Sequence, residues 1–327
     1  MVAGSIVRTL LRRMRATLPR RPRPAILMFH RVAVESFDPW GLAVNPDVFA
    51  RQLDWLKRHR RVMRLTEFAQ LCRQGTLPRE AVAITFDDGY ACFAERAAPL
   101  LERANLPATV FLPVQLMKQE SEFWWDELQE IVLSHEAKLL RLEDIQFELG
   151  CRRDDDMAWR PGAAPATARQ QAFWSLFSRL KHSPHLDREA AMAALRQQAG
   201  RREHIRASHR PMRADEIEAV RSRNVEFGSH GLTHASLPAL PSAAKADEIA
   251  NSVGQCEALT GERPRTYAYA FGDHDAEAEA LVEAAGFCCA CTTEQRTVGS
   301  SERLFALPRV HVGNWTPGRL KQVVGAA

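Results

Sequence analysis

The chain has 327 residues, of which 46% are hydrophobic and 26% charged, and its formal net charge is +4 at pH 7. These values are typical of a soluble globular protein that buries a substantial core. No stretch reaches the roughly 18 apolar residues of a membrane-spanning helix. The basic residues gather near the start without interleaved aromatic residues, which disfavours binding to nucleic acid.

Residues 1–24 form a basic segment, because seven of the eight arginines that precede the first acidic residue, Glu35, lie in it. The segment lacks the apolar core and cleavage site of a secretory signal peptide. It is compatible with a disordered tail and also with a basic amphipathic helix that lies on an anionic membrane face. Seven irregularly spaced cysteines suit a reducing compartment. We therefore expect a cytoplasmic protein, with peripheral contact at the inner face of the membrane as an open alternative.

Residues 25–327 alternate short apolar strands with amphipathic helices, a pattern typical of a parallel α/β fold. Before residue 113, the predicted strands span 26–29, 81–86 and 108–112, and the predicted helices span 46–60, 66–75 and 91–104. After residue 212, the predicted helices span 214–222, 243–260 and 276–285, and the predicted strands end before His230 and span 266–272, 287–292 and 305–312. Thr66 is the expected cap of the second helix.

The alternation breaks between about residues 114 and 211, a distance far longer than a usual connection between strands. This segment contains helical patterns at 124–134 and 169–182, so we predict an inserted helical subdomain. It opens with the aromatic run Phe123-Trp124-Trp125. Such a cluster is suited either to anchoring the insertion by packing or to stacking on sugar rings, and the packing role is favoured.

Polar side chains follow two of the predicted strands directly. The apolar run at 81–86 leads into Asp87 and Asp88, which are followed by Gly89. Aspartate and glycine are common turn residues, but the carboxyl end of a buried parallel strand is also where α/β proteins carry their chemistry.

The second such strand leads into His230 and His234. Their spacing would place both imidazoles on one face of a helical turn. Two imidazoles and a carboxylate form a three-ligand metal set that leaves positions open for water.

These two stretches resemble the motifs of the polysaccharide deacetylases, carbohydrate esterase family four. The first motif of that family is similar to Thr85–Gly89, and its second motif is similar to Ser229–His234. The resemblance extends over Pro24–Pro113 and Met212–Val312. It implies a distorted (β/α) barrel catalytic domain over 25–327, and metal-dependent removal of N-acetyl groups from an N-acetylated sugar, oligosaccharide or exopolysaccharide precursor.

The resemblance also implies roles for the motif residues. Asp88, His230 and His234 are expected to hold one divalent ion, for which zinc is the first choice and cobalt, nickel or iron are alternatives. Asp87 is expected to be the general base that takes a proton from water.

The chain departs from the family at the third motif, where Ala270-Phe271-Gly272 replaces an arginine and a proline that precede a tyrosine. By analogy, the backbone N–H of Phe271 is expected to hold the oxyanion. The arginine that orients the base is expected to be replaced by Arg309 from the last predicted strand.

The general acid is expected to be His30. Many family members carry this histidine in a late Leu-x-x-His motif, which we do not find in this chain. An exopolysaccharide branch of the family carries it near the start, and Leu27–Val32 resembles that form. His311 is the rival candidate. A non-catalytic carbohydrate-binding relative and a metal hydrolase acting on a non-sugar amide remain alternatives, because fold and motif do not determine substrate.

Overall fold

The computed structural model describes residues 22–200, 205–221 and 224–325. Within these residues, parallel strands close a seven-stranded barrel in the order β1-β12-β11-β10-β9-β6-β5, with β5 paired back to β1. The barrel strands are β1 (Ala25–Phe29), β5 (Ala81–Phe86), β6 (Ala108–Leu112), β9 (Val225–Ser229), β10 (Thr266–Ala268), β11 (Cys289–Gln295) and β12 (Leu307–His311). The predicted distorted (β/α) barrel is therefore confirmed.

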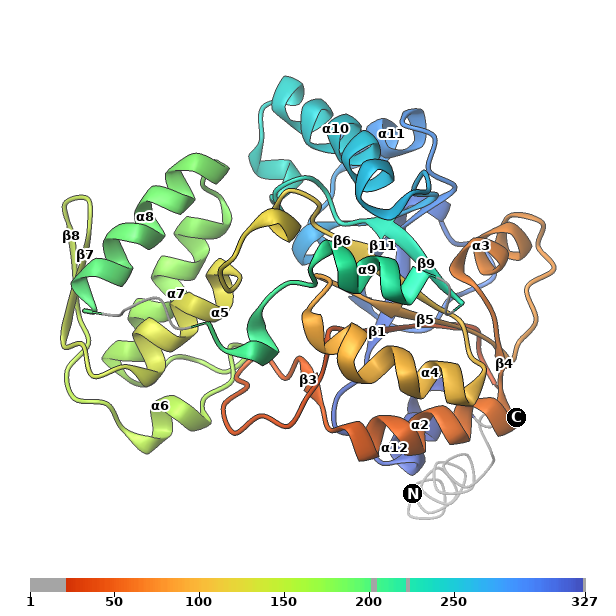
Figure 1. The fold of residues 1–327 in the computed structure, drawn as a ribbon, viewed down its shortest axis with the longest axis horizontal. Helices are drawn as coiled ribbons and strands as arrows, with labels where there is room; N and C mark the ends of the chain where they lie inside the picture. Colours follow the sequence, from red (N-terminus) through yellow and green to blue (C-terminus); the bar gives the residue numbers. More distant parts are fainter. Residues whose placement is uncertain (1–21, 201–204, 222–223, 326–327) are drawn as a thin grey trace, which may run out of the picture.

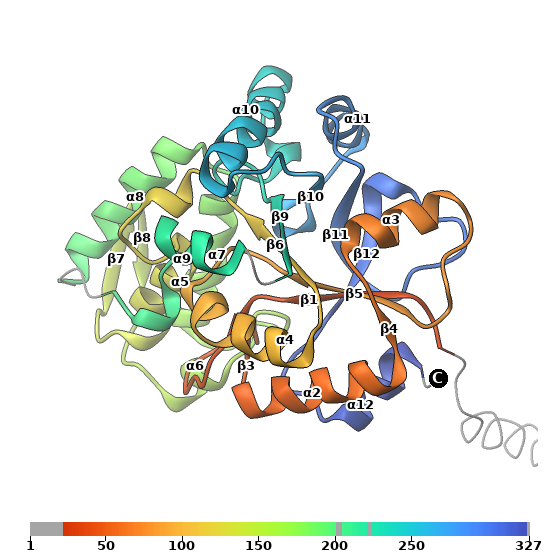
Figure 2. The same cartoon turned by 45° about the vertical axis from the view of Figure 1, so that its right-hand side comes forward.

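Helices surround the barrel, with α10 and α11 on one side and α2, α4 and α12 on the opposite side (Figure 1, Figure 2). The bounds are α2 (Pro46–His59), α3 (Leu65–Arg73), α4 (Ala98–Ala104), α9 (Ala214–Arg221), α10 (Ser242–Thr260), α11 (Ala276–Ala284) and α12 (Pro317–Val324). Short strands β2 (Arg31–Val32) and β3 (Ala43–Val44) pair with each other, and β4 (Arg61–Val62) extends the sheet from β5. The predicted ranges of α2, α10 and α11 agree with these bounds to within one residue.

The start of α3 differs from the prediction. Thr66 does not cap the helix but lies inside it, and its hydroxyl donates a hydrogen bond to the carboxylate of Glu226 on β9. The helix begins at Leu65, which is buried. The N-cap position falls on Arg64, two residues earlier than predicted, and its side chain makes no capping hydrogen bond.

Alternate residues of the barrel strands join two different hydrophobic clusters, as expected for strands that are buried on both faces. Leu27 and Ile84 pack with residues of α2 and α4 outside the barrel. Ile26, Ala83 and Phe111 instead cluster with apolar residues of β10, β11 and β12 and of α3. Because this second cluster draws on six of the seven barrel strands, it includes the barrel interior.

The insertion stands beside the barrel, at the left of Figure 1, and has a hydrophobic core of its own. Its helices are α5 (Trp124–Gln129), α6 (Asp154–Ala158), α7 (Ala168–Lys181) and α8 (His185–Gln198). It also contains an antiparallel hairpin of β7 (Leu139–Leu142) and β8 (Ile145–Glu148), which the helical prediction missed. The first of these strands, Leu-Leu-Arg-Leu, does not alternate apolar and polar residues, so it lacks the period-two signal of a strand.

In the described part of the chain, no helix has both the length and the apolarity needed to cross a bilayer. The predicted tail, residues 1–24, lies outside the described residues except for its last three.

Candidate active site

Asp87 and Asp88 lie where β5 ends, and both side chains are buried. The backbone N–H of Asp87 donates to the carbonyl of Phe29 at the end of β1 (2.9 Å), which continues the sheet pairing by one residue. The chain then turns sharply, with φ of 69° at Asp88 and 67° at Gly89. A Cβ on Gly89 would lie 2.5 Å from the side chain of Leu112, so only glycine fits here. The two aspartates therefore sit in a turn that is also buried.

His230 and His234 do not lie on a helix, so the predicted helical turn is wrong. They flank a loop that follows β9, with φ of 81° at Gly231 and 56° at His234. These backbone angles belong to the left-handed region, which cannot continue a right-handed helix. The loop nevertheless brings the two imidazoles together, with ring centroids 4.7 Å apart.

Two buried side chains outside the predicted motifs hold this loop. The carboxylate of Glu248, on α10, accepts hydrogen bonds from the backbone N–H groups of Leu232 (2.9 Å) and Thr233 (2.6 Å). From the other side, the guanidinium of Arg188, on α8 of the insertion, donates to the carbonyl of Thr233 (2.8 Å). Neither residue belongs to a motif, and only the folded chain brings them to the loop.

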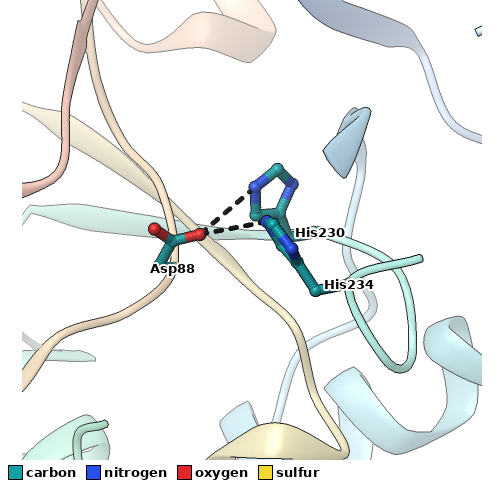
Figure 3. A group of neighbouring side chains, drawn as sticks. All are labelled: Asp88, His230 and His234. Carbon is teal, nitrogen blue, oxygen red and sulfur yellow. Dashed lines mark ion pairs between the residues drawn. The ribbon is translucent and has the colours of Figure 1, made fainter. Parts of the chain in front are cut away.

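Asp88, His230 and His234 converge on one point (Figure 3). One carboxylate oxygen of Asp88, Oδ1, lies 3.5 Å from His230 Nε2 and 3.3 Å from His234 Nε2, and one ligand atom from each residue falls within 4.8 Å of the others. Ligands of a tetrahedral zinc ion lie about 3.3 Å from one another. The spacing of these three donors therefore fits a divalent ion.

The three side chains also influence one another's protonation. His230 Nδ1 lies 2.7 Å from the carbonyl of Ala268, which fixes the proton on Nδ1 and leaves Nε2 free to bind a cation. Burial lowers the pKa of His234 to about 4. Burial favours the protonated form of Asp88, but its contacts with His230 and His234 outweigh it and lower the pKa. Burial favours the neutral form of His230, but its contact with Asp88 outweighs it and raises the pKa. A metal binds an ionised carboxylate and neutral imidazoles, so a bound ion would displace the proton from His230 Nε2.

Asp87 faces a different partner, Arg309 on β12. The two side chains form a bidentate ion pair in which both N–O distances are 2.6 Å, and Arg309 is fully buried. Burial favours the protonated form of Asp87, but the guanidinium of Arg309 outweighs it and lowers the pKa of Asp87 below its usual range. Arg309 also donates a hydrogen bond from Nε to the carbonyl of Thr292, and this bond orients its guanidinium group. Asp87 is therefore held ionised and in one orientation.

Both candidate acids lie close to the aspartates. His30 directly follows β1 and lines a cavity with Asp87 and Asp88. His311 ends β12, and its ring meets that of His30 edge-on with the centroids 5.7 Å apart. Burial lowers the pKa of both groups, that of His311 to about 4. Of the two rings, His30 is the one that lines the cavity.

The cavity above the aspartates has a volume of about 120 Å³ and largely aromatic walls. It is lined by His30, Trp40, Leu42, Asp87, Asp88, Trp125, Phe177, His230, His234, Phe271 and Thr293. Trp125 and Phe177 come from the insertion, so this subdomain completes the site. Trp125 packs against His234, with ring centroids 4.4 Å apart. The aromatic run Phe123-Trp124-Trp125 therefore packs in the core of the insertion and also lines the cavity, through Trp125.

Phe271 lies in a turn and not in a strand. The strand β10 ends at Ala268, so the predicted strand over 266–272 is too long. Residues 270–272 form a single 3₁₀ turn in which Phe271 has φ of 59°. This turn packs the phenyl ring against His234, with centroids 4.5 Å apart. The predicted oxyanion donor, the N–H of Phe271, thus belongs to a residue that lines the cavity.

Comparisons with known proteins agree with this geometry. The sequence profile of the polysaccharide deacetylase family matches residues 74–138 and 187–290. A poly-beta-1,6-N-acetyl-D-glucosamine N-deacetylase of Staphylococcus aureus is 35% identical over 71 residues, which are 21% of this chain. That match spans 24% of the relative, so it covers about a quarter of the curated protein.

Solved structures share the fold. Deacetylase PplD of Streptococcus pyogenes, solved in complex with acetate, aligns with 93% of this chain and 99% of its own, with a TM-score of 0.61 and 16% identity. IcaB of Ammonifex degensii aligns with 93% of this chain and 97% of its own, with a TM-score of 0.56 and 18% identity. The family profile covers more than half of the chain, including Asp87, Asp88, His230 and His234. The chain belongs to the polysaccharide deacetylase family.

Proposed function

We propose that this protein is a metal-dependent hydrolase that removes N-acetyl groups from an N-acetylated sugar, oligosaccharide or exopolysaccharide precursor. The observation that carries the proposal is the pairing of two buried sites: the donor set of Asp88, His230 and His234, and, beside it, Asp87 held by Arg309. The similar staphylococcal protein, named for its action on poly-beta-1,6-N-acetyl-D-glucosamine, supports the same class of substrate.

Asp88, His230 and His234 would hold the ion. A divalent ion, for which zinc is the first choice, would supply polarisation of the acetyl carbonyl and activation of water at neutral pH. Asp87 accepts the proton of the attacking water, because Arg309 keeps its carboxylate ionised and aligned. The oxyanion that develops on the former carbonyl receives a hydrogen bond from the backbone N–H of Phe271.

The leaving amine must take up a proton as the C–N bond breaks. His30 lines the cavity and is positioned to donate it. The methyl group of the acetyl faces the aromatic walls formed by Trp125, Phe177 and Phe271. These walls exclude bulk water, which strengthens the charge interactions among the reacting groups.

A test is the release of acetate from N-acetylglucosamine oligomers by zinc-loaded protein, compared with release from a simple N-acetylated amine. Release from the oligomers alone is expected, together with its loss on chelation and its return with metal. Release from both substrates would favour a general amide hydrolase, and binding of the oligomers without release would favour a non-catalytic carbohydrate-binding protein. In His230→Ala, elemental analysis should show loss of metal along with activity, whereas full occupancy would rule out the proposed ligand set.

A further inference from the structure

The cavity is too small to enclose the proposed substrate. A cavity of roughly 150 Å³ holds one benzene molecule, with six heavy atoms. At about 120 Å³, the cavity therefore accommodates an acetamido group but not the hexose that carries it. The sugar ring and its neighbours must lie on whatever surface continues outward from the cavity.

That surface is a row of aromatic rings. Trp40 and Phe177 line the cavity, with their ring centroids 4.8 Å apart. Trp174, one turn before Phe177 on α7, continues the row: its ring lies 6.5 Å from that of Trp40 and stacks at 18° on Phe177, 6.1 Å away. Trp174 is 42% exposed, although most apolar neighbours on α7 are buried.

Exposure of one tryptophan would mean little by itself, because single apolar residues are common on protein surfaces. Trp40 adds a second observation. Its ring lines the cavity, and its indole Nε1 is buried without a hydrogen-bond partner in the described part of the chain. A buried indole N–H normally finds an acceptor. The unpaired donor therefore points to a ligand that brings one.

We propose that Trp40 and Trp174 form a sugar-binding subsite that extends outward from the cavity, an inference that rests on the proposed function. A pyranose ring has an apolar C–H face and a rim of oxygen acceptors, which match an indole face and an indole N–H. Trp40 contacts the reacting sugar and donates to one of its oxygens. Trp174 stacks on the next sugar along the chain. The enzyme therefore acts on oligomers in preference to monosaccharides.

The experiment compares deacetylation of β-1,6-linked N-acetylglucosamine oligomers of increasing length by the wild type and by Trp174→Ala. We expect the variant to raise KM for long oligomers by roughly fivefold to tenfold, and to leave the monosaccharide unchanged. Trp174→Phe, which keeps an aromatic face, should retain most of the affinity. Leu186→Ala, at a residue 78% exposed on α8, is the control for loss of an exposed apolar side chain from the insertion. An equal effect of Trp174→Ala on monomer and oligomers, or no effect, would overturn the subsite.

A binding measurement separates this inference from the proposed function. Calorimetry with metal-free protein and the longest oligomer should show binding that is weakened in Trp174→Ala and unchanged in Leu186→Ala. If the wild type binds the oligomer in this manner but releases no acetate, the proposed function fails and the subsite stands. If the wild type releases acetate but Trp174→Ala binds equally well, the subsite fails and the function stands. Absence of binding by the wild type also overturns the subsite.

Discussion

Asp87 and Asp88 are adjacent carboxylates with opposite surroundings. The left-handed backbone of Asp88 turns its side chain toward His230 and His234, whereas Asp87 is aligned with the sheet and meets Arg309. Backbone conformations of this kind cost of order 1 kcal/mol each and persist only where the surroundings enforce them. Under the proposed function, the turn thus divides one Asp-Asp pair into a metal ligand and a base.

The different partners predict different effects of substitution. Asp87→Asn should leave metal content near that of the wild type, while kcat falls by roughly two to four orders of magnitude, the usual contribution of general acid–base catalysis. The check is elemental analysis combined with acetate release on the same preparation. Loss of metal in this variant would exchange the roles of the two aspartates.

His30 should supply the proton to the leaving amine. An acid works only while it is protonated, so activity should decline as the pH rises through the pKa of His30 in the complex. We expect His30→Ala to retain fold and metal, to lose most of its turnover, and to lose the basic limb of the pH–rate profile. His311→Ala is the matched comparison, and near-normal turnover in His30→Ala with an inactive His311→Ala would assign the role to His311.

Asp87 and His230 were predictable because each follows a strand directly in the sequence, and Asp88 and His234 because they complete the two motifs that resemble the family. The ion pair of Arg309 with Asp87 joins residues that are 222 positions apart, and the resemblance only suggested it. Trp40, Trp125 and Phe177 carry no such signal, because an aromatic residue that lines a cavity looks the same in sequence as one that fills a core.

At the scale of elements, the loop between β9 and α10 depends on side chains that reach it from both sides. Glu248→Ala removes the acceptor for two backbone N–H groups beside His234. Because groups that orient metal ligands typically contribute 10-fold to 100-fold in affinity, we expect zinc binding to weaken by about that factor. The measurement is competition with a chelator. Glu257→Ala, at an exposed position of the same helix, is the control and should bind zinc like the wild type.

The insertion meets the barrel through a buried polar chain. Trp125 Nε1 donates to the hydroxyl of Tyr90 (2.8 Å), which donates to Asp126 (2.6 Å). Burial raises the pKa of Asp126 to about 7. In the unfolded chain an aspartate has a pKa of about 4. The folded protein therefore keeps a proton that the unfolded chain releases, and this contribution to stability is lost as the pH rises from about 4 to 7.

Asp126→Asn should remove this pH dependence. We expect the stability of the wild type, relative to that of the variant, to fall by up to about 1.4 kcal/mol per pH unit over that range. Urea denaturation of both proteins at several pH values measures the difference, with the exposed Asp187→Asn as control. A difference that does not change with pH would show that Asp126 is ionised throughout.

The helices around the barrel could be predicted well because each buries one face at a regular spacing, as Phe49, Leu53 and Leu56 do on α2. The loops that hold the site could not, since their backbones are set by partners distant in sequence. Glu248 is one example, and the left-handed turn at Phe271 is another. Tertiary contacts overrode the local pattern at both places.

At the scale of the molecule, the role of the basic tail stays a prediction. We expect residues 1–21 to be dispensable for catalysis, because the described chain closes its barrel without them. A protein that begins at Pro22 keeps the hydrogen bond from the N–H of Arg23 to the carbonyl of Val324. Its turnover on a soluble oligomer should equal that of the full chain. A truncated protein that is folded but inactive would show that the tail contributes to the site.

The hydrogen bond between Arg23 and Val324 has a practical consequence. It places the start of β1 beside the end of α12, whereas His30 and the cavity lie past the other end of β1, roughly 16 Å away at 3.3 Å per residue. The described chain can therefore be fixed at Pro22 or at Gly325 to a bead or a sensor surface, with the mouth of the cavity turned toward solution. A polymer too long to diffuse into a porous support would still reach an enzyme immobilised in this orientation.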